Sequence, residues 1–166
     1  MANTDINNTW QPYLKAGGVN EAEFKALLKN IFPDIKKMEG NFKEYDFIIP
    51  SRDLKLELKM DFKSDDTGNL AFEYECFGCK SGLALTTADY YVMTDRLHYY
   101  FFKTDELKSF IRLNWKYLIK KVGGDNNASK MILIRKTDIS RMKHFYSFKK
   151  AGGDINLLRF YFSEWD

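Results

Sequence analysis

The chain has 166 residues, of which 45% are hydrophobic and 30% are charged. This length and composition predict one folded domain with a substantial core, and they exclude a disordered chain. The formal net charge is +3, from 26 basic and 23 acidic residues. A balance this mild does not identify a nucleic-acid partner, although it permits one if the basic residues cluster and the acids gather in a site.

The N-terminus, MANTDINNTWQPYLKAGG, has no basic segment followed by an apolar run, so it does not resemble a signal peptide. No stretch of the sequence approaches the apolar length that a membrane-spanning helix needs. We therefore expect a cytoplasmic protein without a membrane partner.

The first predicted element is a helix that begins near Asn20, where the sequence NEAEFKALLKNIF has apolar residues at helical spacing. Asn20 is expected to cap this helix, Glu23 to complete a capping box, and Pro33 to end it. We therefore divide the chain into an N-terminal extension, residues 1–19, and a single domain, residues 20–166.

A hairpin with strands near residues 45–50 and 54–62 follows. The second strand has apolar residues at every other position and charges between them, so its charged side chains share one face. This charged series consists of Lys55, Glu57, Lys59 and Asp61. If the loop of the hairpin has two residues, Asp46 lies directly opposite Glu57.

Further elements are predicted in the rest of the chain. A strand is expected at LAFEYECF, then either a short helix or a loop leading into a strand at LALTTADYYVMT, and another strand at LHYYFFKT. A helix from about residue 105 to 121 follows, with Thr104 as its cap and Gly123 and Gly124 at its end. KMILIRK and INLLRFYF are predicted as two closing strands. This order indicates an α/β or α+β sheet with helices packed against it.

The two cysteines, Cys76 and Cys79, form a C-x-x-C motif beside glycines that indicate a turn. A structural zinc site needs four ligands, and only His98 and His144 remain to complete a set. We interpret the two cysteines as reduced, partly buried thiols.

The opposed acids of the hairpin indicate a metal site. Directly opposed residues have Cβ atoms roughly 4.5–5.5 Å apart, and two carboxylates at that distance repel each other unless a cation lies between them. A divalent metal such as Mg²⁺ suits carboxylate oxygens, and the neighbouring Lys59 would serve phosphodiester hydrolysis. The alternative is that the alternating charges are only the solvated face of an antiparallel sheet. The opposed Asp46 favours the metal, because an exposed pair would match an acid with a base.

Asp46 followed by Glu57, Leu58 and Lys59 resembles the D-x(n)-E-x-K signature of the PD-(D/E)xK nuclease superfamily, which includes restriction enzymes, Holliday junction resolvases and phage nucleases. The segments FEYECFGCKSGLALTTADYYV and YYFFKTDELKSFI are similar to segments of small phage-type members. The resemblance covers roughly residues 20–140. The residue before the first acid is Tyr45, where the signature has proline.

The resemblance implies an α/β fold of the restriction-endonuclease type, with a mixed central sheet flanked by helices. It also implies a Mg²⁺-dependent DNA endonuclease, with Mn²⁺ able to substitute, that acts in a bacterial cell or a phage-infected host on junctions, other branched DNA or a duplex. Asp46, Glu57 and the Leu58 carbonyl would bind the metal, and Lys59 would position or activate the attacking water. Glu23, or Glu21 as the second choice, would add an acid from the first helix, unless Glu23 serves only in the capping box.

Residues outside the hairpin are expected to hold the nucleic acid or support the site. The expected nucleic-acid contacts are Lys36, Lys37, Ser81, Thr87, Arg141 and Lys143. Glu73 and Glu75 alternate onto one face, where solvation is favoured over a supporting role. Asp89 would either brace the site or form a local hydrogen bond in a turn.

Two rival functions stay open at this point. One is a non-catalytic module that binds nucleic acid or protein and keeps the nuclease fold, because fold does not guarantee chemistry. The other is a nuclease that acts on RNA. Cutting both strands of a duplex would favour a two-fold homodimer.

Overall fold

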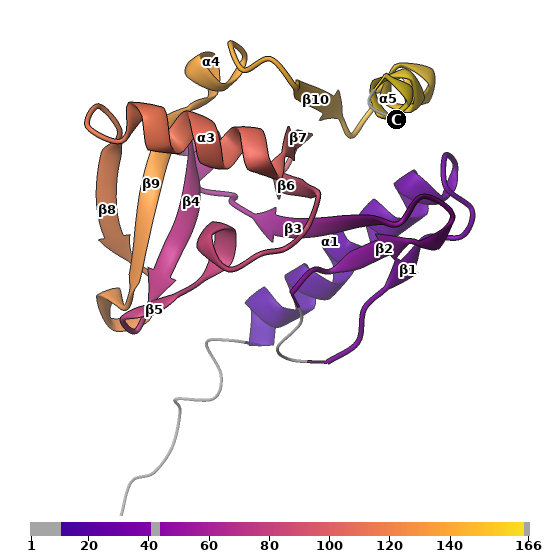
Figure 1. Ribbon diagram of the computed structural model, residues 1–166. Helices are drawn as coiled ribbons and strands as arrows, with labels where there is room; N and C mark the ends of the chain where they lie inside the picture. The colour runs from indigo at the N-terminus through magenta and orange to yellow at the C-terminus, as the bar shows by residue number, and fades with distance from the viewer. Residues whose placement is uncertain (1–10, 41–43, 165–166) are drawn as a thin grey trace, which may run out of the picture.

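The computed structural model describes residues 11–40 and 44–164, and within these ranges the strands form two sheets (Figure 1). The six-stranded sheet has the order β1-β2-β3-β6-β7-β10, and the four-stranded sheet has the order β5-β4-β9-β8. The strands are β1 (Lys36–Lys37), β2 (Phe47–Ile49), β3 (Leu54–Met60), β4 (Asn69–Cys76), β5 (Cys79–Lys80), β6 (Tyr90–Thr94), β7 (His98–Lys103), β8 (Ile119–Gly123), β9 (Ser129–Arg135) and β10 (Phe145–Lys149). The helices are α1 (Gln11–Lys29), α2 (Ser64–Thr67), α3 (Thr104–Asn114), α4 (Lys136–Ile139) and α5 (Ile155–Ser163), with 3-10 turns η1 (Pro50–Arg52), η2 (Gly82–Ala84) and η3 (Asp125–Asn127).

The six-stranded sheet is mixed, because β3 pairs in parallel with β6 while its other described pairs are antiparallel. One face of this sheet packs against α1 and α5. Phe24 and Leu28 from α1 are fully buried in that core, together with Leu158 from α5. Alternation along the strands supplies the other half of the core, with side chains such as Leu56 and Phe101.

The opposite face of the six-stranded sheet meets the four-stranded sheet and α3, which lies across β4, β8 and β9 in Figure 1. Phe72 of β4 and Ile132 of β9 pack there with Leu107 of α3. Tyr91 and Phe102 contribute from the large sheet. The protein is therefore a mixed α/β structure with a mixed sheet and flanking helices, as the sequence predicts at this level.

The predicted hairpin is confirmed as β2 and β3. Its connection is the 3-10 turn η1 followed by Asp53, whose backbone is left-handed with φ of 47°. Phe47 pairs with Leu56 and Ile49 pairs with Leu54, which is the register predicted for the opposed acids.

The first helix begins earlier than predicted. Because α1 starts at Gln11, the predicted boundary between residues 19 and 20 falls inside the helix. Asn20 is a buried residue in the middle of α1 and does not cap it; its side-chain oxygen accepts a hydrogen bond from Lys150 at 3.3 Å. Glu23 therefore completes no capping box.

Two predictions near the C-terminal half are wrong. The helix α3 ends at Asn114, and residues 119–123 form the edge strand β8, so Gly123 ends a strand and not a helix. The segment INLLRFYF is the helix α5 and not a strand. Its N-cap is Asp154, which accepts a hydrogen bond from the backbone N–H of Asn156 at 2.8 Å. The apolar spacing of Ile155, Leu158 and Phe162 is helical, so the capping signal and this spacing outweigh the strand propensity of the aromatic residues.

The turn predicted at the C-x-x-C motif is confirmed. Cys76 pairs with Cys79 across the hairpin of β4 and β5, and both thiols are reduced. The connecting residues, Phe77 and Gly78, have φ of 49° and 77°, as a tight two-residue hairpin turn requires. Cys76 is partly buried and Cys79 is exposed. Within the described ranges, no helix is long and apolar enough to cross a membrane.

A buried carboxylate fixes the turn between β6 and β7. Asp95 accepts hydrogen bonds from the Lys136 amine at 2.7 Å and the Tyr100 hydroxyl at 2.6 Å. It also accepts the backbone N–H groups of Leu97 and His98. Burial alone would raise the pKa of Asp95, but these donors outweigh burial and lower the pKa to about 2.

We expect Asp95 to make folding sensitive to acid. Because its pKa is lower in the folded than in the unfolded chain, it stabilises the fold above about pH 4, and this contribution is lost as the pH falls toward 2. The loss should be about 2 kcal/mol of unfolding free energy. Asp95→Asn should lower the unfolding free energy at neutral pH by about 3 kcal/mol and remove this pH dependence. Denaturant unfolding at several pH values tests this, with the exposed Asp66→Asn as control; parallel pH profiles for wild type and Asp95→Asn would contradict it.

Candidate active site

Asp46 and Glu57 lie close together on the charged face of the hairpin, where both charges act on Lys59 and Tyr91. The regular ladder of β2 and β3 stops at the pair of Phe47 and Leu56, and the Asp46 N–H donates to the Leu56 carbonyl. Both side chains are buried, with exposed fractions of 5% for Asp46 and 6% for Glu57. Their face is the one that looks toward the four-stranded sheet, because Phe47 and Leu56 point into the core on the α1 side. A wet sheet face would leave both acids exposed, so burial argues against simple solvation.

Asp46 directly precedes β2 and lies beside the edge of β3. Its carboxylate accepts a hydrogen bond from the backbone N–H of Leu58 at 2.8 Å. The backbone N–H of Asp46 donates a hydrogen bond to the Leu56 carbonyl at 2.9 Å, so the backbone groups of Leu56 point toward Asp46. Leu58 is two residues further along β3, and the backbone groups of alternate residues in a strand point to the same side. The Leu58 carbonyl therefore points toward the same edge as Asp46, where the sequence predicts a metal ligand.

Lys59 compensates the buried charge. Its amine lies 2.6 Å from the Glu57 carboxylate. Burial tends to lower the pKa of Lys59, but the carboxylates of Glu57, Asp46 and Glu73 outweigh that effect and raise the pKa above its usual value. Lys59 consequently carries its proton at neutral pH.

Glu73 belongs to this cluster, which the sequence analysis did not predict. It accepts a hydrogen bond from the Ser81 hydroxyl at 2.5 Å, and its charge acts on both Lys59 and Tyr91. The predicted alternation fails because a β-bulge lies between Glu73 and Glu75. Glu75 instead forms an ion pair with Lys130 at 2.6 Å.

Tyr91 lies in the interior beside the three carboxylates. It is the β6 partner of Glu57 in the parallel ladder and is 1% exposed. Burial raises the pKa of its phenol well above the usual value, and the charges of Glu57, Glu73 and Asp46 raise it further. Tyr91 is therefore a neutral hydroxyl that stays protonated at any physiological pH.

A cleft of about 600 Å³ opens from this cluster between the two sheets. Lys59, Glu73 and Tyr91 line it on the side of the acids. Lys63 and Lys121 line it as well, and neither is among the predicted contacts. The lining therefore combines three lysines with two acids, Asp61 and Glu73, while Asp46 and Glu57 are buried behind it.

Asp61, the last of the charged series on β3, also lines this cleft. It accepts a hydrogen bond from the backbone N–H of Ala71 at 2.8 Å and so joins the end of β3 to β4. Burial raises the pKa of its carboxyl above the usual value. Its role is to hold the four-stranded sheet against the hairpin.

The acids of the first helix are placed differently from the prediction. Glu23 acts electrostatically on Tyr99 and Lys150, which belong to the α1 side of the large sheet, so Glu23 is separated from Glu57 by the sheet. Glu21 forms an ion pair with Lys37. The pKa of Lys37 is raised mainly by Glu21 and in part by Asp46. Of the two acids, Glu21 therefore lies nearer to the site.

The predicted nucleic-acid contacts are scattered. Ser81 reaches the site through Glu73, and Thr87 donates a hydrogen bond to the Glu44 carboxylate at 3.0 Å. Lys36 is exposed on β1. Arg141 and Lys143 are exposed residues that line a separate pocket against α3 and not the cleft.

Asp89 forms local hydrogen bonds, which is one of the two roles predicted for it. Its carboxylate accepts the backbone N–H of Lys55 at 2.8 Å, and its own N–H donates to the Lys55 carbonyl at 2.9 Å. These bonds join the start of β6 to β3 and so help to set the parallel register.

The donors near Asp46 suit a hard cation. Within residues 11–40 and 44–164, no group of three or more histidine, cysteine and acidic side chains is arranged to hold a metal. A Mg²⁺ ion typically takes one or two carboxylates and keeps several waters, so Asp46, Glu57 and the Leu58 carbonyl form a sufficient oxygen set. Comparisons with protein-family models, curated proteins and solved structures find no match for this chain.

We expect divalent cations to stabilise the folded protein through the opposed acids. CaCl₂ should raise the Tm of the wild type by mass action, and Asp46→Asn and Glu57→Gln should each remove most of the increase. Lys59→Met should bind Ca²⁺ more tightly, because its amine no longer competes for Glu57. Thermal unfolding across a CaCl₂ titration measures this, with Glu75→Gln as a control that keeps the wild-type shift. An equal shift in Asp46→Asn and the wild type would exclude a cation at this pair.

Proposed function

We propose that this protein is a Mg²⁺-dependent DNA endonuclease with a restriction-endonuclease-like fold. The observation that carries the proposal is the burial of two neighbouring carboxylates, Asp46 and Glu57, beside a protonated Lys59 that lines the cleft between the two sheets. Burying two adjacent acids is costly without cations nearby, so the arrangement is difficult to explain as a structural feature alone. The resemblance of Asp46, Glu57 and Lys59 to the D-x(n)-E-x-K signature supports the same function.

The arrangement of elements also supports the proposed fold. A helix, α1, packs against a mixed sheet whose hairpin, β2 and β3, carries the signature. This is the helix and hairpin-containing mixed sheet that the resemblance implies. The segment between β3 and β6, however, contains β4, β5 and the short helix α2 in place of a long helix.

In the proposed reaction, Asp46, Glu57 and the Leu58 carbonyl would hold a Mg²⁺ ion, and the scissile phosphate would lie over Lys59. When bound, the metal would supply water activation and stabilise charge on the phosphate. The raised pKa of Lys59 gives it an electrostatic role, so it orients the water and offsets phosphate charge as a cation and does not abstract the proton. Lys63 and Lys121 contact the DNA backbone along the cleft.

Glu73 is a positioning residue in this mechanism. Its negative charge helps to keep Lys59 protonated, and the Ser81 hydroxyl fixes the orientation of the carboxylate. Such supporting groups typically contribute a factor of about 10–100 to activity or metal affinity.

The role of Lys59 separates a nuclease from a binding module. Lys59→Ala should reduce Mg²⁺-dependent cleavage by about 100-fold or more, because one positioned cation is lost at the phosphate. DNA affinity with Ca²⁺ in place of Mg²⁺ should change little, since one lysine accounts for only about one unit of the salt slope. Lys55→Ala is the matched control, because Lys55 is on the same strand and face but directs its amine toward the Tyr45 ring. Cleavage rates and DNA titrations on branched and linear duplexes measure both properties.

Three outcomes of this comparison would decide the function. DNA binding without cleavage, insensitive to chelator, would replace the nuclease with a binding module. Cleavage of RNA but not DNA would change the substrate. If the Lys59→Ala variant cuts DNA at the wild-type rate, Lys59 is only a structural partner of Glu57. The homodimer stays a prediction that sedimentation with and without a duplex can test.

We expect Glu73→Gln to reduce cleavage by about 10- to 100-fold. Its distinguishing effect is on pH, because loss of the Glu73 charge lowers the pKa of Lys59 and so moves the alkaline limit of activity to lower pH. Ser81→Ala should act in the same direction but more weakly. A pH–rate profile measures the effect, with Glu75→Gln, whose partner Lys130 is exposed, as control. A rate loss with an unmoved alkaline limit would restrict Glu73 to a structural role.

A further inference from the structure

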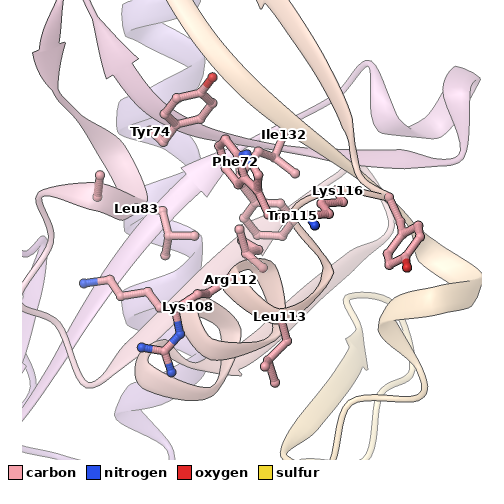
Figure 2. A pocket seen from close by; sticks show the side chains of 12 residues that line it. Phe72, Tyr74, Leu83, Lys108, Arg112, Leu113, Trp115, Lys116 and Ile132 are labelled. Atoms are coloured by element: carbon pink, nitrogen blue, oxygen red, sulfur yellow. The ribbon is translucent and has the colours of Figure 1, made fainter.

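A second hollow lies on the far side of the four-stranded sheet from the cleft. It has a volume of about 770 Å³ and is enclosed between α3 and the strands β4 and β9. Figure 2 shows Lys108, Arg112 and Leu113 along α3, with Phe72, Tyr74 and Ile132 across the pocket. Four of the lining residues are aromatic: Phe72, Tyr74, Trp115 and Tyr117. The proposed nuclease chemistry does not use this pocket.

The charges around this pocket have one sign. Lys108, Arg112 and Lys116 line it, and among the described residues no acidic side chain does. Lys108 and Arg112 are four residues apart on α3, so they lie about 6 Å apart along the helix axis on one face. Lys108 also donates a hydrogen bond to the Thr86 carbonyl at 3.0 Å, which holds its amine at the end of the pocket near η2. The rim therefore attracts a polyanion.

Two of the four aromatic residues of this pocket, Trp115 and Tyr117, are exposed, whereas Phe72 is fully buried. Of the eleven large hydrophobic side chains exposed in the described ranges, five lie in residues 113–122. Trp115 is 41% exposed and Tyr117 is 85% exposed. The Trp115 ring meets Tyr74 edge to face, with ring centroids 5.5 Å apart, and the Lys120 amine lies 5.0 Å from the Trp115 ring centroid. The indole is therefore held in place and still accessible, as a stacking platform requires.

The turn η2 separates this pocket from the active-site cleft. Gly82 lines the cleft, while Leu83 and Ala84 line the pocket. Gly82 has φ of 49°, and a Cβ added there would lie 2.7 Å from the Glu73 carbonyl oxygen, so only glycine allows this close approach. Neighbouring residues of η2 therefore line the cleft and the pocket.

We propose that this pocket binds an unpaired DNA strand, with a base stacked on Trp115 and adjacent phosphates on Arg112 and Lys116. The pocket would then select a branched or frayed DNA substrate whose single strand passes over η2. This choice of substrate rests on the proposed nuclease function. The combination of aromatic rings with a wholly basic rim favours an unpaired strand over an acidic peptide, which would use the cations but not the exposed rings. A duplex is disfavoured because its bases are stacked within the helix and present no face to Trp115.

The test compares two fluorescent oligomers of about 12 nucleotides, one of thymidylate and one abasic, in chelator so that no cleavage occurs. The two probes carry the same charge, so any difference in affinity reports on the bases. The wild type should bind the thymidylate oligomer at least about five-fold more tightly than the abasic one. Trp115→Ala should remove this preference, and Trp115→Phe should keep part of it. Unchanged affinity of Trp115→Ala for the abasic oligomer shows that the variant is folded.

The charge of the rim has its own variant and control. Arg112→Gln should weaken both oligomers equally and reduce the salt slope by about one unit, because it removes a phosphate contact. Lys149→Gln, on β10, should leave both affinities unchanged. Equal affinity of the wild type for the two oligomers, or a preference that survives in Trp115→Ala, would overturn the proposal. The proposal would also be overturned if a glutamate-rich peptide competed for the pocket and the protein showed no preference for the thymidylate oligomer.

The same variants distinguish this inference from the nuclease proposal. If the base preference holds but no DNA is cut with Mg²⁺ or Mn²⁺, the pocket stands and the nuclease proposal fails. If the protein cuts DNA and shows no base preference, the nuclease proposal stands and the pocket assignment fails.

Discussion

The rest of the site depends on one electrostatic constraint: two carboxylates, Asp46 and Glu57, are buried side by side. Buried acids of like charge repel each other, and the fold answers with the Leu58 N–H at Asp46 and the Lys59 amine at Glu57. The hairpin imposes the proximity, because Asp46 is bound to β3 through the backbone of Leu56 and Leu58, the two neighbours of Glu57. A sequence that only needed a stable hairpin would place a base opposite an acid.

The second sheet turns this hairpin into an enclosed site. Without β4 and β9, the charged face of β3 would be an ordinary solvated surface. Ala71 and Asp61 join the two sheets through a hydrogen bond, and the regular alternation of β4 up to Glu73 directs that acid toward Lys59 and Tyr91. The low dielectric between the sheets strengthens each charge interaction, which is the condition under which a single lysine has a large effect on a phosphate.

The parts that sequence predicts well are those set by local rules. The turn after Ile49 and the alternation of β3 fix the register of Phe47 with Leu56, so the closeness of Asp46 and Glu57 can be predicted from a short stretch. The aromatic residues of α5 have strand propensity, which is why the prediction of a strand there is wrong. Asp154 and the apolar spacing carry the helical signal. The burial of Glu73 depends on which sheet covers its face of β4, which is a tertiary property, and the bulge that moves Glu75 off that face leaves no clear trace in the residues themselves. The position of Glu23 depends on how α1 packs, which is a tertiary property.

The two hollows of the four-stranded sheet divide two physical tasks between its faces. Successive residues of β4 point to opposite sides, so Glu73 serves the acidic cleft while Phe72 and Tyr74 serve the aromatic pocket. A metal site needs oxygen ligands held rigidly in a polar setting, whereas a stacking platform needs exposed rings in a positive field. One face cannot easily supply both, because the acids that bind a cation would repel the strand that the rings attract. The four-stranded sheet separates the charges of the two hollows, and η2 lines both of them.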